Sequence, residues 1–99
     1  MEVNDLQLGQ VVRSVAGRDK GRFFLVMQII DSNYVKICDG DLRKIDKAKV
    51  KKKKHIAKTN KIIPQIKERL TNNLKVSNAD IRKYLEEYRK NALYENGGN

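Results

Sequence analysis

Apolar and β-branched residues gather in three short runs near the start of the chain, and turn-forming residues separate them. The runs extend from Gln10 to Val15, from Arg22 to Ile30 and from Tyr34 to Cys38. Such runs, bounded by Gly, Asp, Asn and Ser, predict β-strands. Weaker candidates for a fourth and a fifth strand are Leu42 to Ile45 and Lys51 to Ile56. Closely spaced short strands predict a small barrel or sandwich.

The second of these runs is nearly continuous in apolar residues, so we expect its strand to pack on both faces. Phe23, Phe24 and Tyr34 are expected to fill the core of the sheet rather than to stack on nucleic-acid bases.

From Lys58 onward the apolar pattern changes to the period of a helix. Ile62, Ile66 and Leu70 recur four residues apart, which predicts a first helix. Pro64 is compatible with the first turn of that helix, where its missing N–H has no partner to lose.

A second helix is better marked. Ser77 is a candidate N-cap, with Asp80 three residues later, and the apolar stripe that follows comprises Ile81, Tyr84, Leu85 and Tyr88. We expect the two tyrosines to pack this helix onto its neighbour. The sequence therefore predicts a mainly β fold with an α-helical C-terminal extension. It divides the chain into a β domain over residues 1–56, two short helices within residues 57–95 and a frayed tail over residues 96–99.

The charge of the chain narrows the classes of partner. The 99 residues include 22 Lys and Arg against 12 Asp and Glu, giving a net charge of +10. Such an excess attracts polyanions at long range, so RNA, DNA and anionic membranes are candidates. Much of it lies between Arg43 and Lys61, where Asp46 is the single acid. A block this dense is typical of nucleic-acid binding, and the absence of a lipidation signal disfavours a membrane.

A basic loop flanked by glycines separates the first two predicted strands. Gly17 and Gly21 permit a positive φ and a close backbone approach to phosphate. Asp19 can accept a hydrogen bond that orients the loop, and the cations available to phosphate are Arg18, Lys20 and Arg22. A solvated hairpin turn is the alternative on local chemistry alone. The spacing is not that of a P-loop, because it lacks the Gly-Lys-Ser/Thr ending and leads into a strand.

Residues for catalysis or metal binding are few. Cys38 and His55 are the single cysteine and histidine, which excludes an internal disulfide. Neither residue has the context of a nucleophile–base pair or a zinc-ligand spacing, and Cys38 is expected to be a structural thiol. We therefore expect no enzymatic activity, metal, cofactor or small-molecule substrate. No apolar run is long enough to span a bilayer and no secretory signal is recognisable, so a cytoplasmic location is expected.

Residues 8–56 resemble the KOW-domain proteins, and more narrowly the eukaryotic-type large-subunit ribosomal protein family. The resemblance lies in Val11 to Ile30 with the basic loop at its centre, in the hexapeptide 39–44 and in the Lys-rich segment that ends at Ile56. Phe24 stands where many KOW motifs have a glycine, and this favours the eukaryotic-type ribosomal branch. The resemblance implies an SH3-like β-barrel that docks on structured RNA, usually ribosomal RNA, through the loop after the first strand.

Charge and resemblance together predict a non-catalytic RNA-binding protein associated with translation and with the ribosome. Its expected partners are RNA, above all ribosomal RNA, and ribosomal proteins. The basic loop would position the protein on the RNA, while the lysine run from Lys47 to Lys54 would supply much of the affinity. The residues expected to contact RNA are Arg13, Gly17, Arg18, Lys20, Gly21, Arg22, Arg43, Lys44, Lys47, Lys49, Lys51, Lys52, Lys53 and Lys54. The alternative is a protein-interaction module of the transcription or translation machinery, with the C-terminal helices as the partner surface.

Overall fold

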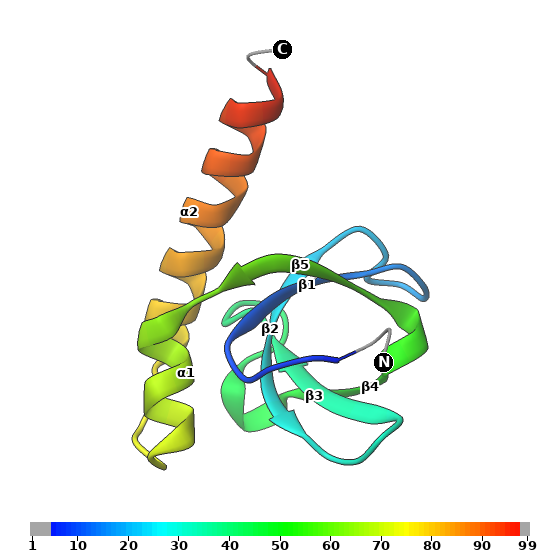
Figure 1. The fold of residues 1–99 in the computed structure, drawn as a ribbon, viewed down its shortest axis with the longest axis vertical. Coiled ribbons are helices and arrows are strands. Elements are labelled where there is room, and N and C mark those ends of the chain that lie inside the picture. Colours follow the sequence, from blue (N-terminus) through cyan, green and yellow to red (C-terminus); the bar gives the residue numbers. More distant parts are fainter. Residues whose placement is uncertain (1–4, 98–99) are drawn as a thin grey trace.

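The computed structural model describes residues 5–97, with side chains to residue 92, and consists of five strands followed by two helices (Figure 1). The strands are β1 (Gln10–Ser14), β2 (Phe23–Ile29), β3 (Tyr34–Cys38), β4 (Lys49–Lys52) and β5 (Ile56–Ile62). The helices are α1 (Pro64–Thr71) and α2 (Asn78–Gly97). Two single 3-10 turns, η1 (Ile45–Lys47) and η2 (Lys53–His55), precede β4 and β5.

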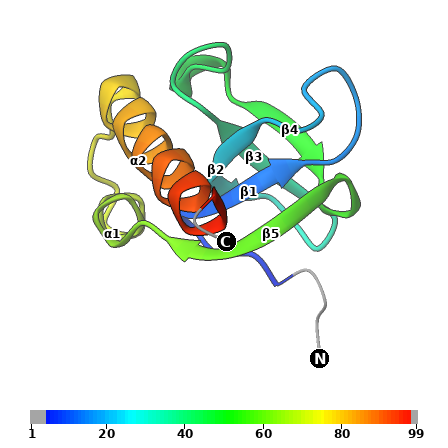
Figure 2. The ribbon, with the colours of Figure 1, turned by 90° about the horizontal axis from the view of Figure 1, so that it is seen from above.

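All five strands form one antiparallel sheet in the order β4-β3-β2-β1-β5. Strands β1 to β4 follow one another as a meander, and β5 then returns to pair with β1, placing Ile56 opposite Ser14. A register shift in β2 between Val26 and Gln28 bends that strand, and the sheet curls strongly (Figure 2). Within the described residues β4 and β5 remain the two edges, so the sheet does not close into the predicted barrel. The prediction of a mainly β fold followed by C-terminal helices is confirmed.

One face of the curled sheet encloses the first of two hydrophobic clusters. Most inward strand positions contribute an aliphatic or aromatic side chain, as the period of two along a strand requires, whereas the buried Ser14 and Lys51 are polar. The cluster consists of Leu6, Val12, Phe24, Val26, Val35, Ile37 and Ile56.

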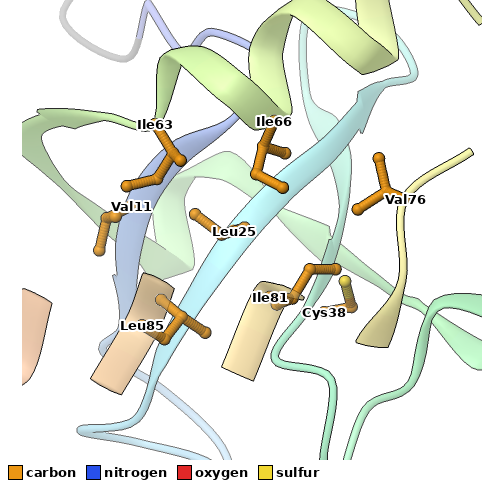
Figure 3. Close-up of a cluster of buried hydrophobic side chains, with 8 residues drawn as sticks. All are labelled: Val11, Leu25, Cys38, Ile63, Ile66, Val76, Ile81 and Leu85. Atoms are coloured by element: carbon orange, nitrogen blue, oxygen red, sulfur yellow. The ribbon is translucent and has the colours of Figure 1, made fainter. Parts of the chain in front are cut away.

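The two helices cover the other face and form the second cluster with it (Figure 3). Val11, Leu25 and Cys38 point from the sheet toward the apolar side chains of the helices and their connections, which are Ile63, Ile66, Val76, Ile81 and Leu85. Tyr88 of α2 packs edge-on against Phe23 of β2, with ring centroids 5.4 Å apart. The predicted packing of β2 on both faces is therefore confirmed.

The first three predicted strands are confirmed, and the weaker two are not. Leu42–Ile45 was predicted as a strand, but the backbone bends there because the side chain of Asp39 accepts the N–H groups of Asp41 and Arg43. The predicted strand from Lys51 to Ile56 instead spans the end of β4, the 3-10 turn η2 and the start of β5.

The prediction of helix from Lys58 is wrong, since β5 continues to Ile62 and pairs with β1. The helix begins at Pro64, and the residue before a proline is disfavoured in helical conformation, so Ile63 adopts extended backbone angles. Pro64 lies in the first turn of α1, as predicted.

The predicted start of the second helix is confirmed. The backbone N–H of Asp80 donates to the Ser77 hydroxyl at 3.0 Å, which is the expected cap. Helix α2 has 20 residues, is longer than expected and continues through residues 96 and 97 of the predicted tail; residues 98 and 99 lie outside the described part of the chain. Neither α1 nor α2, as described, has the length and apolar character that crossing a bilayer needs.

Candidate nucleic-acid interface

The basic loop between β1 and β2 is a folded turn held by its own backbone. The N–H of Gly21 donates to the carbonyl of Ser14 at 2.7 Å, and that of Arg22 donates to the carbonyl of Asp19 at 3.0 Å. Gly17 and Gly21 have φ values of 85° and 89°, a region that favours glycine. The predicted conformation of both glycines is confirmed.

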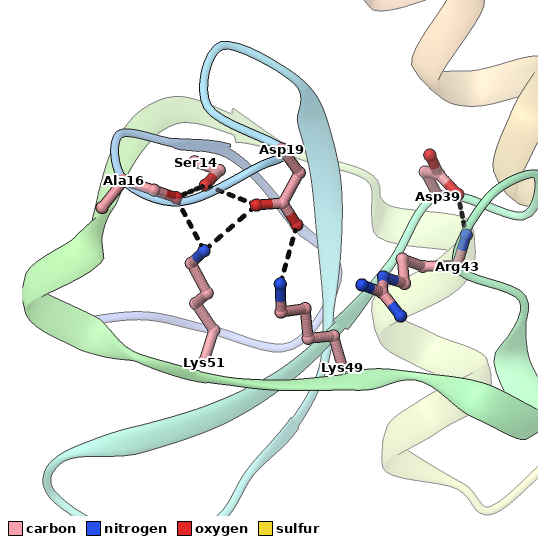
Figure 4. Close-up of polar contacts among 7 residues, drawn as sticks. All are labelled: Ser14, Ala16, Asp19, Asp39, Arg43, Lys49 and Lys51. Carbon is pink, nitrogen blue, oxygen red and sulfur yellow. Dashed lines mark hydrogen bonds and ion pairs between the residues drawn. The ribbon is translucent and has the colours of Figure 1, made fainter.

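The carboxylate of Asp19 anchors this loop to β4. Asp19 is buried and accepts from Lys51 Nζ at 3.2 Å, from Lys49 Nζ at 3.4 Å and from the Ser14 hydroxyl at 3.3 Å (Figure 4). Lys51 Nζ also donates to the carbonyl of Ala16 at 2.9 Å. Burial alone would raise the pKa of Asp19, but hydrogen bonds from Lys51, the backbone and Lys49, together with the charge of Lys51, outweigh it and leave the pKa below its ordinary value.

The lysines of β4 therefore point to two different sides of the strand. Side chains alternate along a strand, so Lys49 and Lys51 point toward the loop, while Val50 and Lys52 are exposed on the other side of β4. Lys51 is buried and its ammonium group is occupied by two oxygens of the loop. The structure thus gives Lys51 a role in fixing the loop, whereas the sequence predicted a direct RNA contact.

A second buried carboxylate, Asp39, fixes the neighbouring turn. It accepts the N–H groups of Asp41 and Arg43 at 2.9 and 2.8 Å, and Arg22 Nη2 lies 3.1 Å from its other oxygen. This brings the basic loop beside the turn, and both line a depression of about 280 Å³. Its lining residues are Arg18, Asp19, Arg22, Phe24, Leu42 and Arg43.

The structure does not bring all the predicted residues to this one place. Arg13 is exposed on β1, and Lys20 is exposed in the basic loop. Lys44 and Lys47 are exposed in the connection from β3 to β4. Lys52, Lys53 and Lys54 instead line a separate depression beside the β2–β3 turn. The other residues of this depression are Ser32, Asn33 and Tyr34.

Sequence reasoning missed the cations of α2. Arg82 donates to the carbonyl of Gly40, which connects the start of α2 to the turn of residues 39–43, called the Asp39 turn. A depression of about 390 Å³ between this turn and the helix is lined by Arg22, Asp39, Asp41, Ala79, Arg82, Lys83, Glu86 and Arg89. The seven-residue spacing of Arg82 and Arg89 along one face was the available signal, but the interspersed acids hid it.

Two further features lie apart from these cations. Cys38 is fully buried beneath the helices, and burial, with the nearby Asp39 charge, raises the pKa of its thiol to about 12. A depression of about 620 Å³ lies where β5 meets α1 and α2, and it includes Lys61, Tyr84 and Tyr88.

Comparison with known proteins adds no relative: no protein-family model matches the sequence, and a search of curated proteins finds no match.

Proposed function

We propose that this protein binds structured RNA through the surface formed by the basic loop (residues 17–22) and the Asp39 turn (residues 39–43). One observation carries the proposal. Three arginines, Arg18, Arg22 and Arg43, line a single depression, and two buried carboxylates fix the backbone on which they stand.

This arrangement suits a phosphate backbone. A guanidinium group can bind a phosphate with two parallel hydrogen bonds, and a cation on a fixed loop loses less conformational entropy when it binds. Double-stranded RNA is recognised mainly by its shape and its phosphates, which requires few free aromatic side chains. The net charge of +10 would attract such a ligand at long range.

The proposal extends to the fold family. The meander β1 to β4, the 3-10 turn η2 and the return of β5 to β1 are compatible with an SH3-like fold of the KOW type whose sheet stays open between β4 and β5. In that family the loop after the first strand docks on RNA, and here that loop is the basic loop. On this reading the protein is translation-associated and the ligand is ribosomal RNA, a proposal that rests on the sequence resemblance.

The test compares two variants that each remove two charges. Arg18→Ala with Arg43→Ala alters the proposed surface but leaves the Arg22–Asp39 ion pair in place. Arg69→Ala with Lys75→Ala is the matched control, because both side chains are exposed around the α1–α2 connection, away from the basic loop (Figure 1). Binding of an RNA hairpin is measured by fluorescence anisotropy over a series of salt concentrations.

We expect the first variant to bind at least about tenfold more weakly. Its slope of log K against log salt should fall by about 1.4 to 1.8, since each of the two lost phosphate contacts removes roughly 0.7 to 0.9. The control should keep most of its affinity. Equal losses in the two variants would show binding through net charge alone, and absence of binding by the unaltered protein would also refute the proposal.

A further inference from the structure

The geometry points to a second subsite on the same protein, a pocket for one unpaired RNA nucleotide whose base stacks on Tyr34. We call it the Tyr34 pocket, and define it by the residues Ser32, Asn33, Tyr34, Lys52, Lys53 and Lys54. The inference rests on the proposed RNA-binding function, and it adds a preference for RNA that contains an unpaired base.

The turn that carries Tyr34 is rigidly built. A single oxygen of Asp31 accepts the N–H groups of Asn33 and Tyr34, both at 2.8 Å. The carbonyl of Tyr34 accepts the N–H of Ile30 at 3.0 Å, closing the β2–β3 hairpin. Tyr34 therefore stands on a fixed backbone, which lowers the cost of ordering it around a ligand.

The lysines are held against the same turn. Lys52 is paired with Tyr34 across β3 and β4, so their side chains lie on the same face of the sheet. The N–H of Lys53 donates to the carbonyl of Asn33 at 2.8 Å, which fastens the start of η2 to the β2–β3 turn. Tyr34 and three consecutive lysines thus line one depression.

Tyr34 differs from the other described aromatic residues of the sheet. Phe24 is fully buried in the inner cluster, and Phe23 packs against Tyr88. Tyr34 belongs to neither hydrophobic cluster and is partly exposed, although the sequence predicted it in the core. Tyr34 is thus only partly used in packing, and it lines the depression.

The chemistry of the pocket selects a nucleotide. Its volume of about 260 Å³ is below the roughly 300 to 1,000 Å³ of pockets for whole drug-sized molecules, and suits a single planar base. A base can stack on the tyrosine, Ser32 and Asn33 can hydrogen-bond its edge, and the lysines can neutralise the flanking phosphates. A base inside a regular duplex cannot reach such a pocket, so the nucleotide must be unpaired.

The experiment uses two RNA hairpins that differ by one bulged nucleotide, with 2-aminopurine at the bulge. We expect the unaltered protein to prefer the bulged hairpin by roughly 5- to 150-fold, the range of one base–aromatic stack, and to quench the 2-aminopurine fluorescence. Tyr34→Ala should lose both the preference and the quenching, yet still bind the regular hairpin. Tyr34→Phe keeps the ring and should retain both.

The outcomes separate this inference from the proposed function. Thermal unfolding first establishes that both Tyr34 variants are folded. If the regular hairpin binds but the bulge brings no preference, or if Tyr34→Ala keeps the preference, the Tyr34 pocket is wrong while RNA binding stands. If neither hairpin binds, the proposed function fails, and this inference fails with it.

Discussion

The ammonium nitrogen of Lys51 lies 3.2 Å from a carboxylate oxygen of Asp19, although 32 residues separate them along the chain. Only 7% of the Lys51 side chain and 11% of the Asp19 side chain are exposed. This ion pair joins β4 to the loop that carries Arg18 and Arg22, so the folded conformation of the loop depends on a lysine of the neighbouring basic run. Stability and the proposed RNA binding are therefore connected through one contact.

Replacing Lys51 should be costly. In Lys51→Ala the buried carboxylate of Asp19 keeps only the more distant Lys49 as a cationic partner. Removing all partners of a buried charge costs roughly 3 kcal/mol, and because Lys49 remains we expect about 1 to 3 kcal/mol in the free energy of unfolding. Urea denaturation measures this, with Lys52→Ala as the control, since the adjacent exposed lysine should change stability by less than about 0.5 kcal/mol. Similar values for the two variants would contradict the anchoring role.

The same ion pairs predict an acid-sensitive stability. The pKa of Asp19 in the folded protein is below its ordinary value of 3.8, so near that pH the unfolded chain binds more protons than the folded protein. The stabilisation is therefore fully present above pH 3.8 and disappears as the pH falls through the lower folded pKa. The free energy of unfolding, measured from pH 6 to pH 2.5, should fall more steeply for the unaltered protein than for Asp19→Asn. Parallel curves would exclude the contribution of Asp19.

Asp19→Asn also distinguishes a fixed loop from simple charge attraction. The substitution raises the net charge by one, so attraction through net charge alone predicts tighter RNA binding. It also removes the charge that holds Lys49 and Lys51, so a loop that must be fixed predicts weaker binding. We expect the weaker binding, by several-fold in anisotropy titrations at constant salt. Tighter binding by a folded variant would show that the loop conformation does not matter.

Two glycines of the candidate interface should differ in their tolerance of substitution. Gly21 and Gly40 both have positive φ, 89° and 77°. A methyl group on Gly21 meets open space, so Gly21→Ala should cost only the backbone strain, about 1 to 2 kcal/mol. On Gly40 the methyl group would overlap the backbone carbonyl of Asn78 at the start of α2.

Gly40→Ala should therefore be destabilising by more than about 3 kcal/mol, since the first turn of α2 must move in addition to the backbone strain. Thermal unfolding of both variants tests the difference. Equal effects on the melting temperature would mean that α2 yields easily at its N-terminal end.

The sequence predicted the parts of the fold that depend on local chemistry. The strands β1, β2 and β3 follow from β-branched runs bounded by turn residues, and the Ser77 cap follows from a short motif. It mispredicted β5, because Ile62 and Ile66 match the period of a helix. That strand is defined by its pairing with β1 some 45 residues earlier, and local periodicity does not contain this information.

In the candidate interface, too, features that depend on local chemistry were predictable and features that depend on strand pairing were not. The positive φ of Gly17 and Gly21 was predictable, because it depends on the loop itself. The burial of Lys51 was not, because in the sequence it is one of four consecutive lysines, and only the strand pairing gives it a direction. Tyr34 was assigned to the core for a related reason: an aromatic residue at the edge of a turn has the same sequence signature as one inside the sheet.

The consecutive residues Phe24, Leu25 and Val26 of β2 alternate between the two hydrophobic clusters, so this one strand contributes buried side chains to both. Neither cluster can be dismantled without removing support from the other, and we expect a single cooperative unfolding transition for sheet and helices together. A fragment ending at Ile62 would expose Val11, Leu25 and Cys38 to water and would be prone to aggregate. The helices are therefore better studied by point substitution than by truncation.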